Sequence, residues 1–166
     1  MNPLEITTEA ERGFQQAVKQ YLCLLSADLT QVLRQLIQHS YPEDVVELAF
    51  ELFPDGFSEG FPVQTFFLDA DNSEVFIMVN GEAQYPSPVE PELLENPQVY
   101  PWELESNYAM GDNEFNAWGI ASYTLIDWFF DCWQQAGGKH FPLKAKIGVH
   151  DSRHQFDLIK GQWHKG

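Results

Sequence analysis

The segment from residue 112 to residue 138 constrains the fold most, because it is the most apolar and aromatic stretch of the chain. Its large side chains recur at the spacing of one helical face. That face comprises Trp118, Ser122, Leu125, Phe129 and Trp133. Asp112 is placed to cap the first turn, and Gly137 can end the helix because glycine tolerates the left-handed conformation. We therefore predict a long aromatic helix over residues 112–138 that buries this face in a core.

The N-terminal region has the pattern of amphipathic helices. Thr8 and Glu11 have the spacing of a capping box, in which each side chain accepts a hydrogen bond from the other residue's backbone N–H. Apolar residues then recur at helical intervals until Pro42 interrupts them. Residues 26–28 either separate two helices or kink a single helix. In both cases we expect the apolar stripe to face the core.

Strand patterns follow the helices. Residues 43–53 alternate between apolar and polar, and a helix there would stack glutamates at four-residue spacing, so a strand is favoured. Further strands are predicted over 62–68, 74–79 and 82–85. Asn80 and Gly81 are typical of a type I′ hairpin turn, which needs positive φ at both positions. Together these segments predict an antiparallel meander.

Five prolines fall between Tyr85 and Trp102, a density that interrupts both helices and sheets. Long loops of this kind are often functional. After the aromatic helix, residues 143–149 and 155–159 alternate as the two strands of a C-terminal hairpin, with Lys144 and Lys146 on one face.

These elements predict an α+β fold in a single domain, with an antiparallel sheet of about five or six strands and the aromatic helix packed on one sheet face. The predicted order is N-terminal helices over 7–41, a meander over 44–85, a proline-rich loop over 86–111, the aromatic helix over 112–138, and a C-terminal hairpin with a basic tail over 139–166.

Charge is distributed unevenly along the chain. Residues 35–138 contain no Lys or Arg but nineteen Asp and Glu residues. The first 34 residues, this middle segment and the last 28 residues carry net charges of −1, −19 and +4, for a total of −16. An acidic body repels the phosphate backbone of nucleic acids and steers the association of a basic protein. The same charge is also common in proteins for which it only aids solubility, so both interpretations remain open.

The preferred hypothesis is a small, acidic, non-catalytic protein that binds a basic partner. By size and charge alone, its nearest analogy is a bacterial immunity protein or inhibitor that neutralises a cationic toxin. The expected contacts are the acids of the middle segment, which are Glu43, Glu47, Glu51, Asp55, Glu59, Glu90, Glu92, Glu95, Glu103 and Glu105.

The alternative hypothesis is a small enzyme or a ligand- or metal-binding protein with a pocket between the aromatic helix and the sheet. Two carboxylates at helical spacing, Asp127 and Asp131, could share a proton. The turn containing His150, Asp151 and His154 could hold zinc with a further ligand. Neither pattern matches a known catalytic or metal-binding motif, and glycine-rich nucleotide loops are absent from the sequence. We therefore favour a protein that is not an enzyme, leave catalysis open as the alternative, and expect no cofactor or metal.

The apolar runs are too short to cross a bilayer, and the first residues lack the pattern of a secretion signal, so we expect a cytoplasmic protein without membrane contact. Cys23 and Cys132 are expected to be buried free thiols. The acidic body and the basic C-terminal segment could also pair between copies, which would give a homo-oligomer.

Overall fold

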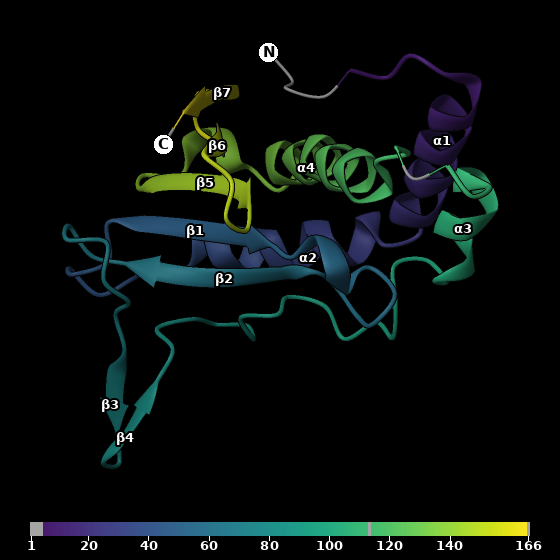
Figure 1. Cartoon of the computed structure of the whole chain (residues 1–166). Helices are drawn as coiled ribbons and strands as arrows, with labels where there is room; N and C mark the ends of the chain where they lie inside the picture. Colours follow the sequence, from purple (N-terminus) through teal and green to yellow (C-terminus); the bar gives the residue numbers. More distant parts are fainter. Residues whose placement is uncertain (1–4, 113, 166) are drawn as a thin grey trace.

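Helices cover one face of a five-stranded sheet in the computed structural model, which describes residues 5–112 and 114–165. Figure 1 shows α2 (Ser26–Gln38) and α4 (Ala117–Gln135) on that face, while α1 (Glu9–Cys23) and α3 (Glu103–Ala109) lie beside one end of α4. The α+β prediction is confirmed, including the N-terminal helices and the long helix packed on the sheet.

The N-terminal segment forms two helices, because the chain breaks between α1 and α2. The predicted capping box is present at the start of α1. Glu11 donates its backbone N–H to Thr8 Oγ1 at 3.1 Å, and Thr8 donates its own N–H to Glu11 Oε1 at 2.8 Å. Because the N–H groups of Thr8 and Glu11 have no backbone partner within the helix, these two hydrogen bonds stabilise the first turn of α1.

The main sheet has the strand order β2-β1-β5-β6-β7. The bounds of these strands, in chain order, are Glu47–Leu52 (β1), Val63–Leu68 (β2), Lys144–Val149 (β5), His154–Asp157 (β6) and Gln162–Lys165 (β7). Short 3₁₀ turns follow β1 at Pro54–Gly56 and α4 at Gly138–His140.

Strand β1 lies between an antiparallel neighbour, β2, and a parallel neighbour, β5. The sheet is therefore mixed, where the sequence predicted an antiparallel one. A parallel neighbour needs a crossover connection, and α4 lies in the segment that connects β2 to β5. Alternating apolar residues identify the buried side of a strand, but they do not identify its neighbour.

Only the first two strands of the predicted meander join the main sheet. Strands β3 (Ile77–Val79) and β4 (Glu82–Gln84) pair with each other in a separate two-stranded sheet. Asn80 and Gly81 join them with φ angles of 52° and 84°, so the predicted type I′ hairpin turn is confirmed.

The aromatic helix is shorter than predicted. Helix α4 begins after Asn116, whose side chain accepts the N–H of Gly119 at 3.0 Å, so the prediction of Asp112 as its cap is wrong. Both residues have the short polar side chain that suits a cap, and the sequence did not distinguish them. Gly137 follows the helix at φ 97°, as predicted. The segment predicted as a loop over 86–111 contains α3.

The core forms where the aromatic face of α4 meets β1. The ring of Phe50 lies 4.9 Å from that of Phe129 and 6.0 Å from that of Trp133, measured between centroids. Ser122 and Leu125 are also buried. Trp118, which was predicted on this face, is 50% exposed. It lies in the first turn of α4, and its indole Nε1 donates to Glu105 of α3 at 3.2 Å.

The C-terminal residues are not a free tail. They form β7 at the edge of the sheet, and Trp163 packs against Phe156 and Tyr123 at centroid distances of 5.4 and 5.2 Å. A single apolar residue among polar ones is too weak a pattern to predict a strand. Cys132 is buried as expected, whereas Cys23 is exposed at the end of α1, and both thiols are free. In the part of the chain described, no helix is long and apolar enough to span a bilayer.

Candidate protein-binding surface

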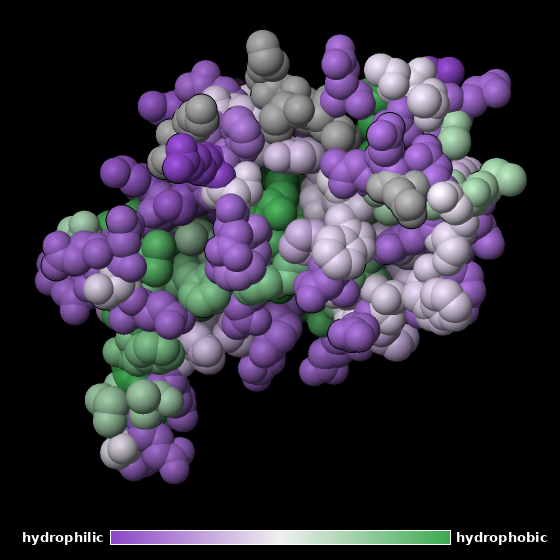
Figure 2. All heavy atoms as spheres, in the orientation of Figure 1, coloured by the Kyte–Doolittle hydropathy of each residue, from purple (hydrophilic) through white to green (hydrophobic). Residues whose placement is uncertain are grey.

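The hairpin of β3 and β4 projects from the rest of the molecule (Figure 1). We call residues 75–85 the arm. Every residue of its two strands is exposed, so the arm contributes little to the core. Figure 2 shows apolar side chains gathered on this projecting hairpin.

One face of the arm is entirely apolar. Residues opposite each other in an antiparallel pair point to the same side, so Met78 and Ala83 share a face. Alternation along the strands places Phe76 and Tyr85 on that face as well, and their ring centroids are 5.3 Å apart. Met78 is 68% exposed and Phe76 is 44% exposed. The arm therefore presents to solvent a surface of the kind that usually lies in an interface.

The base of the arm is fixed to β2. Val75 donates its N–H to the carbonyl of Phe67 at 2.8 Å, and the ring of Tyr85 lies 6.5 Å from that of Phe67. Before the arm, Asp69 Oδ1 accepts the N–H groups of Asp71 and Ser73, each at 2.9 Å, which orders the turn. These contacts tie the base of the arm to the end of β2.

The proline-rich segment returns along the outer edge of β2. Thr65 of β2 donates its N–H to the carbonyl of Pro91 at 2.9 Å, and Val99 donates its N–H to the carbonyl of Phe57 at 2.7 Å. These bonds hold the segment against the sheet and satisfy part of an edge that would otherwise expose donors.

Exposed carboxylates border this edge. Glu59 and Glu92 line one shallow hollow beside β2, and Glu95 lines another between the proline-rich segment and α2. Glu90 lies next to Pro91 and is also exposed. We call Glu59, Glu90, Glu92 and Glu95 the acidic strip. Four of the ten predicted partner-binding acids therefore lie on the proline-rich segment and the turn that precedes β2.

Three other predicted acids, Glu47, Glu51 and Asp55, lie near Lys146 or His150 of the C-terminal segment. Because β5 pairs with β1, Lys146 Nζ comes within 3.6 Å of Glu47 Oε1, and His150 Nδ1 within 2.5 Å of Glu51 Oε1. The hydrogen bond to Glu51 raises the pKa of His150; partial burial opposes this, and the charges of Glu51, Asp151 and Asp55 add to it. The negative surface is therefore not continuous over β1.

The remaining acids have separate locations. Glu105 accepts hydrogen bonds from the hydroxyl of Tyr100 at 2.7 Å and from the indole of Trp118, so it ties α3 to its neighbours. Glu43 is exposed before β1, and Glu103 is exposed in the first turn of α3.

The residues of the alternative site occupy two environments. Asp127 lies on α4, where burial and the charge of Asp131 raise its pKa and Lys19 of α1 lowers it. His150 instead lies over the ring of Phe53 at 4.7 Å, with Asp151 exposed in the adjoining turn.

His154 begins β6. The rings of Phe50, Phe129 and Trp133 fill the space between α4 and β1 where the pocket was expected. Over residues 5–112 and 114–165, no group of three or more His, Cys, Asp and Glu side chains is arranged to hold a metal ion.

The apolar face of the arm was not predicted as a site. Phe76 to Val79 form an unbroken apolar run, which is typical of a strand buried on both faces. One feature of the sequence could have indicated the exposed hairpin. Pro86 comes only four residues after the start of the second strand, and a proline limits how far that strand can extend into a larger sheet.

No family model, curated protein or solved structure matches the chain.

Proposed function

We propose that the protein is a non-catalytic binding module, of the immunity-protein or inhibitor kind, that engages a basic protein through the arm and the acidic strip. The observation that carries this proposal is the apolar face of the arm. Full burial of an exposed Phe or Met side chain contributes about 1.5–3 kcal/mol, and a partner could gain the part that corresponds to the exposed fractions of Phe76 and Met78.

Charge selects the class of partner. The arm and the acidic strip both lie within the segment that contains no Lys or Arg. A basic surface is attracted to this region and its association is accelerated, whereas a second copy of the chain, also with net charge −16, is repelled. The arm leaves one end of β2, and Glu59 and Glu92 lie by the other end. A partner that spans β2 would meet both apolar and charged groups, which protein interfaces commonly combine.

We place the protein in the cytoplasm. The exposed free thiol of Cys23 supports this location, because such thiols persist in a reducing compartment and tend to oxidise outside it.

The test is a comparison of binding by three forms of the full chain. An arm variant carries Phe76→Ala and Met78→Ala, and a control variant carries Leu24→Ala and Met110→Ala, which remove exposed apolar side chains elsewhere. Proteins captured from an extract of the source cells by the native chain are purified and titrated calorimetrically against all three forms.

We expect a partner of net positive charge whose affinity falls by about 2–4 kcal/mol in the arm variant and is unchanged in the control. A neutral or acidic partner would overturn the charge argument. Equal binding by the arm variant and the native chain would overturn the role of the arm. Sedimentation of the native chain alone as a dimer that the arm variant abolishes would instead assign the arm to self-association.

A further inference from the structure

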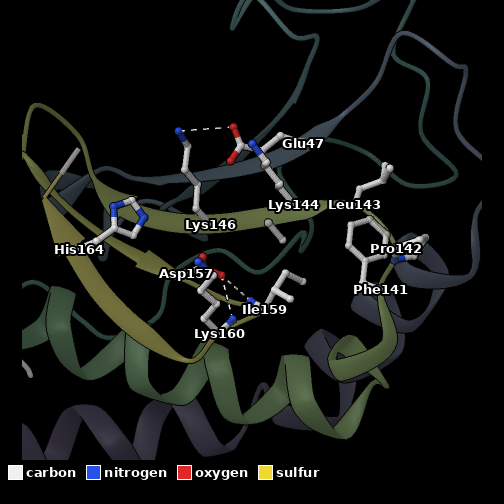
Figure 3. A pocket seen from close by; sticks show the side chains of 11 residues that line it. Glu47, Phe141, Pro142, Leu143, Lys144, Lys146, Asp157, Ile159, Lys160 and His164 are labelled. Carbon is white, nitrogen blue, oxygen red and sulfur yellow. Dashed lines mark hydrogen bonds and ion pairs between the residues drawn. The ribbon is translucent and has the colours of Figure 1, made fainter.

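A cavity of about 470 Å³ opens on the sheet face opposite α2 and α4 (Figure 3). One part of its wall is apolar and comprises Phe141, Pro142, Leu143 and Ile159. The other part is charged or polar and comprises Glu47, Lys144, Lys146, Asp157, Lys160 and His164. Its volume is in the range of small-molecule sites.

Sheet geometry explains why basic residues gather here. Alternation along β5 directs Lys144 and Lys146 to the open face, while Ala145 and Ile147 point into the core. Lys160 comes from the turn between β6 and β7, and His164 from β7 itself. Three of the nine Lys and Arg residues of this acidic chain thus line one cavity.

Both acids of the cavity are already engaged. Glu47 is paired with Lys146 at 3.6 Å. Asp157 Oδ1 accepts the backbone N–H groups of Ile159 and Lys160 at 2.8 and 2.9 Å, as Figure 3 shows. Among the described residues, no ion pair involves Lys144 or Lys160. Two ammonium groups therefore border the cavity without a carboxylate partner.

We propose that this cavity binds a small organic anion, in which a carboxylate or phosphate group lies near Lys144 and Lys160 and an apolar body contacts Leu143 and Ile159. Lysine binds either anion as a point charge. Partial enclosure strengthens the attraction relative to open water. The negative charge elsewhere on the chain acts weakly at this site, because physiological salt screens it beyond about 8 Å.

The site is separate from the proposed protein-binding surface. The arm adjoins β2 at one edge of the sheet, whereas the cavity is lined mainly by β5, β6 and β7, with Glu47 of β1 at its margin. Glu47 does not belong to the arm or to the acidic strip. Anion binding in the cavity can therefore be tested independently of the binding of a basic protein.

Four probes separate the contributions of charge and apolar body: benzoate, phenyl phosphate, benzyl alcohol and inorganic phosphate. Each is titrated into the full chain while amide NMR shifts are recorded. We expect saturable binding of the two organic anions, with shifts concentrated in residues 141–146 and 157–160, and binding of the other two at least about tenfold weaker. The stronger of the two organic anions identifies the preferred head group.

The matched variants are Lys144→Gln with Lys160→Gln, and Lys139→Gln as a control at an exposed lysine outside the cavity. The double variant should lose at least about tenfold in affinity, and the control should lose none. No saturable binding of either organic anion up to about 10 mM would overturn the proposal. So would equal binding by the double variant, equally tight inorganic phosphate, or shifts located elsewhere in the native chain.

Discussion

Single residues of β1 acquire their partners from a strand almost a hundred positions later in the chain. His150 and Glu51 illustrate this, since the parallel pairing of β1 with β5 places them in hydrogen-bond contact. A histidine whose pKa is raised in the folded state binds its proton more tightly there than in the unfolded chain. Its contribution to stability is therefore fully present below the ordinary value of 6.5 and is lost as pH rises through the raised pKa.

The prediction at this scale concerns Glu51→Gln. The substitution should lower the pKa of His150, because the hydrogen bond to the carboxylate is the main cause of its elevation. It should also reduce stability at pH 6 more than at pH 9. An NMR titration of the His150 imidazole measures the first effect, and urea unfolding at the two pH values measures the second. Glu47→Gln is the control, because Glu47 pairs with Lys146. An unchanged His150 titration in Glu51→Gln would refute the pairing.

At the scale of elements, we expect the arm to unfold locally without the rest of the domain, whereas the helices and the main sheet unfold together. Gly81 and Gly137 both have positive φ, and a methyl group added at either position would meet no other atom within 4 Å. They differ in location, because Gly81 turns the arm whereas Gly137 follows the end of α4. We expect Gly81→Ala to speed amide exchange in β3 and β4 while changing global unfolding by less than about 0.5 kcal/mol.

Gly137→Ala should instead cost about 1 kcal/mol of global stability, because the strain falls at the end of a helix that builds the core. Urea unfolding and hydrogen exchange on both variants distinguish the two cases. Equal global losses would show that the arm unfolds together with the body.

The elements that the sequence predicted correctly are those fixed by local chemistry. Thr8 and Glu11 form their capping box within four residues, and Asn80-Gly81 forms its turn within two. The neighbours of β1 depend instead on a crossover through α4, and β7 depends on β6 being present beside it. The same distinction holds for the candidate surface. Its acids were predicted from the charge of the sequence, whereas the exposure of the arm depends on β3 and β4 forming a sheet separate from the main one.

At the scale of the whole molecule, the net charge of −16 opposes folding through self-repulsion. Few attractive contacts offset it among the described residues: Lys146 pairs with Glu47, His150 pairs with Glu51 and Asp151, and Lys19 attracts Asp127. We therefore expect the midpoint of thermal unfolding to rise when sodium chloride is increased from roughly 0.02 to 0.3 M, because the Debye length shortens and repulsion weakens. Calorimetry at constant pH checks this. A midpoint that falls with salt would mean that attractive pairs dominate the charge balance.

The base of the arm gives this fold a modular character. Val75 and Tyr85 both contact Phe67 at the end of β2, so the chain leaves the sheet and rejoins it at one place. The tip of a hairpin attached in this way can change in length or sequence while the strands of the main sheet keep their register. New recognition properties could therefore arise by mutation within a few residues, at little risk to the scaffold that carries them.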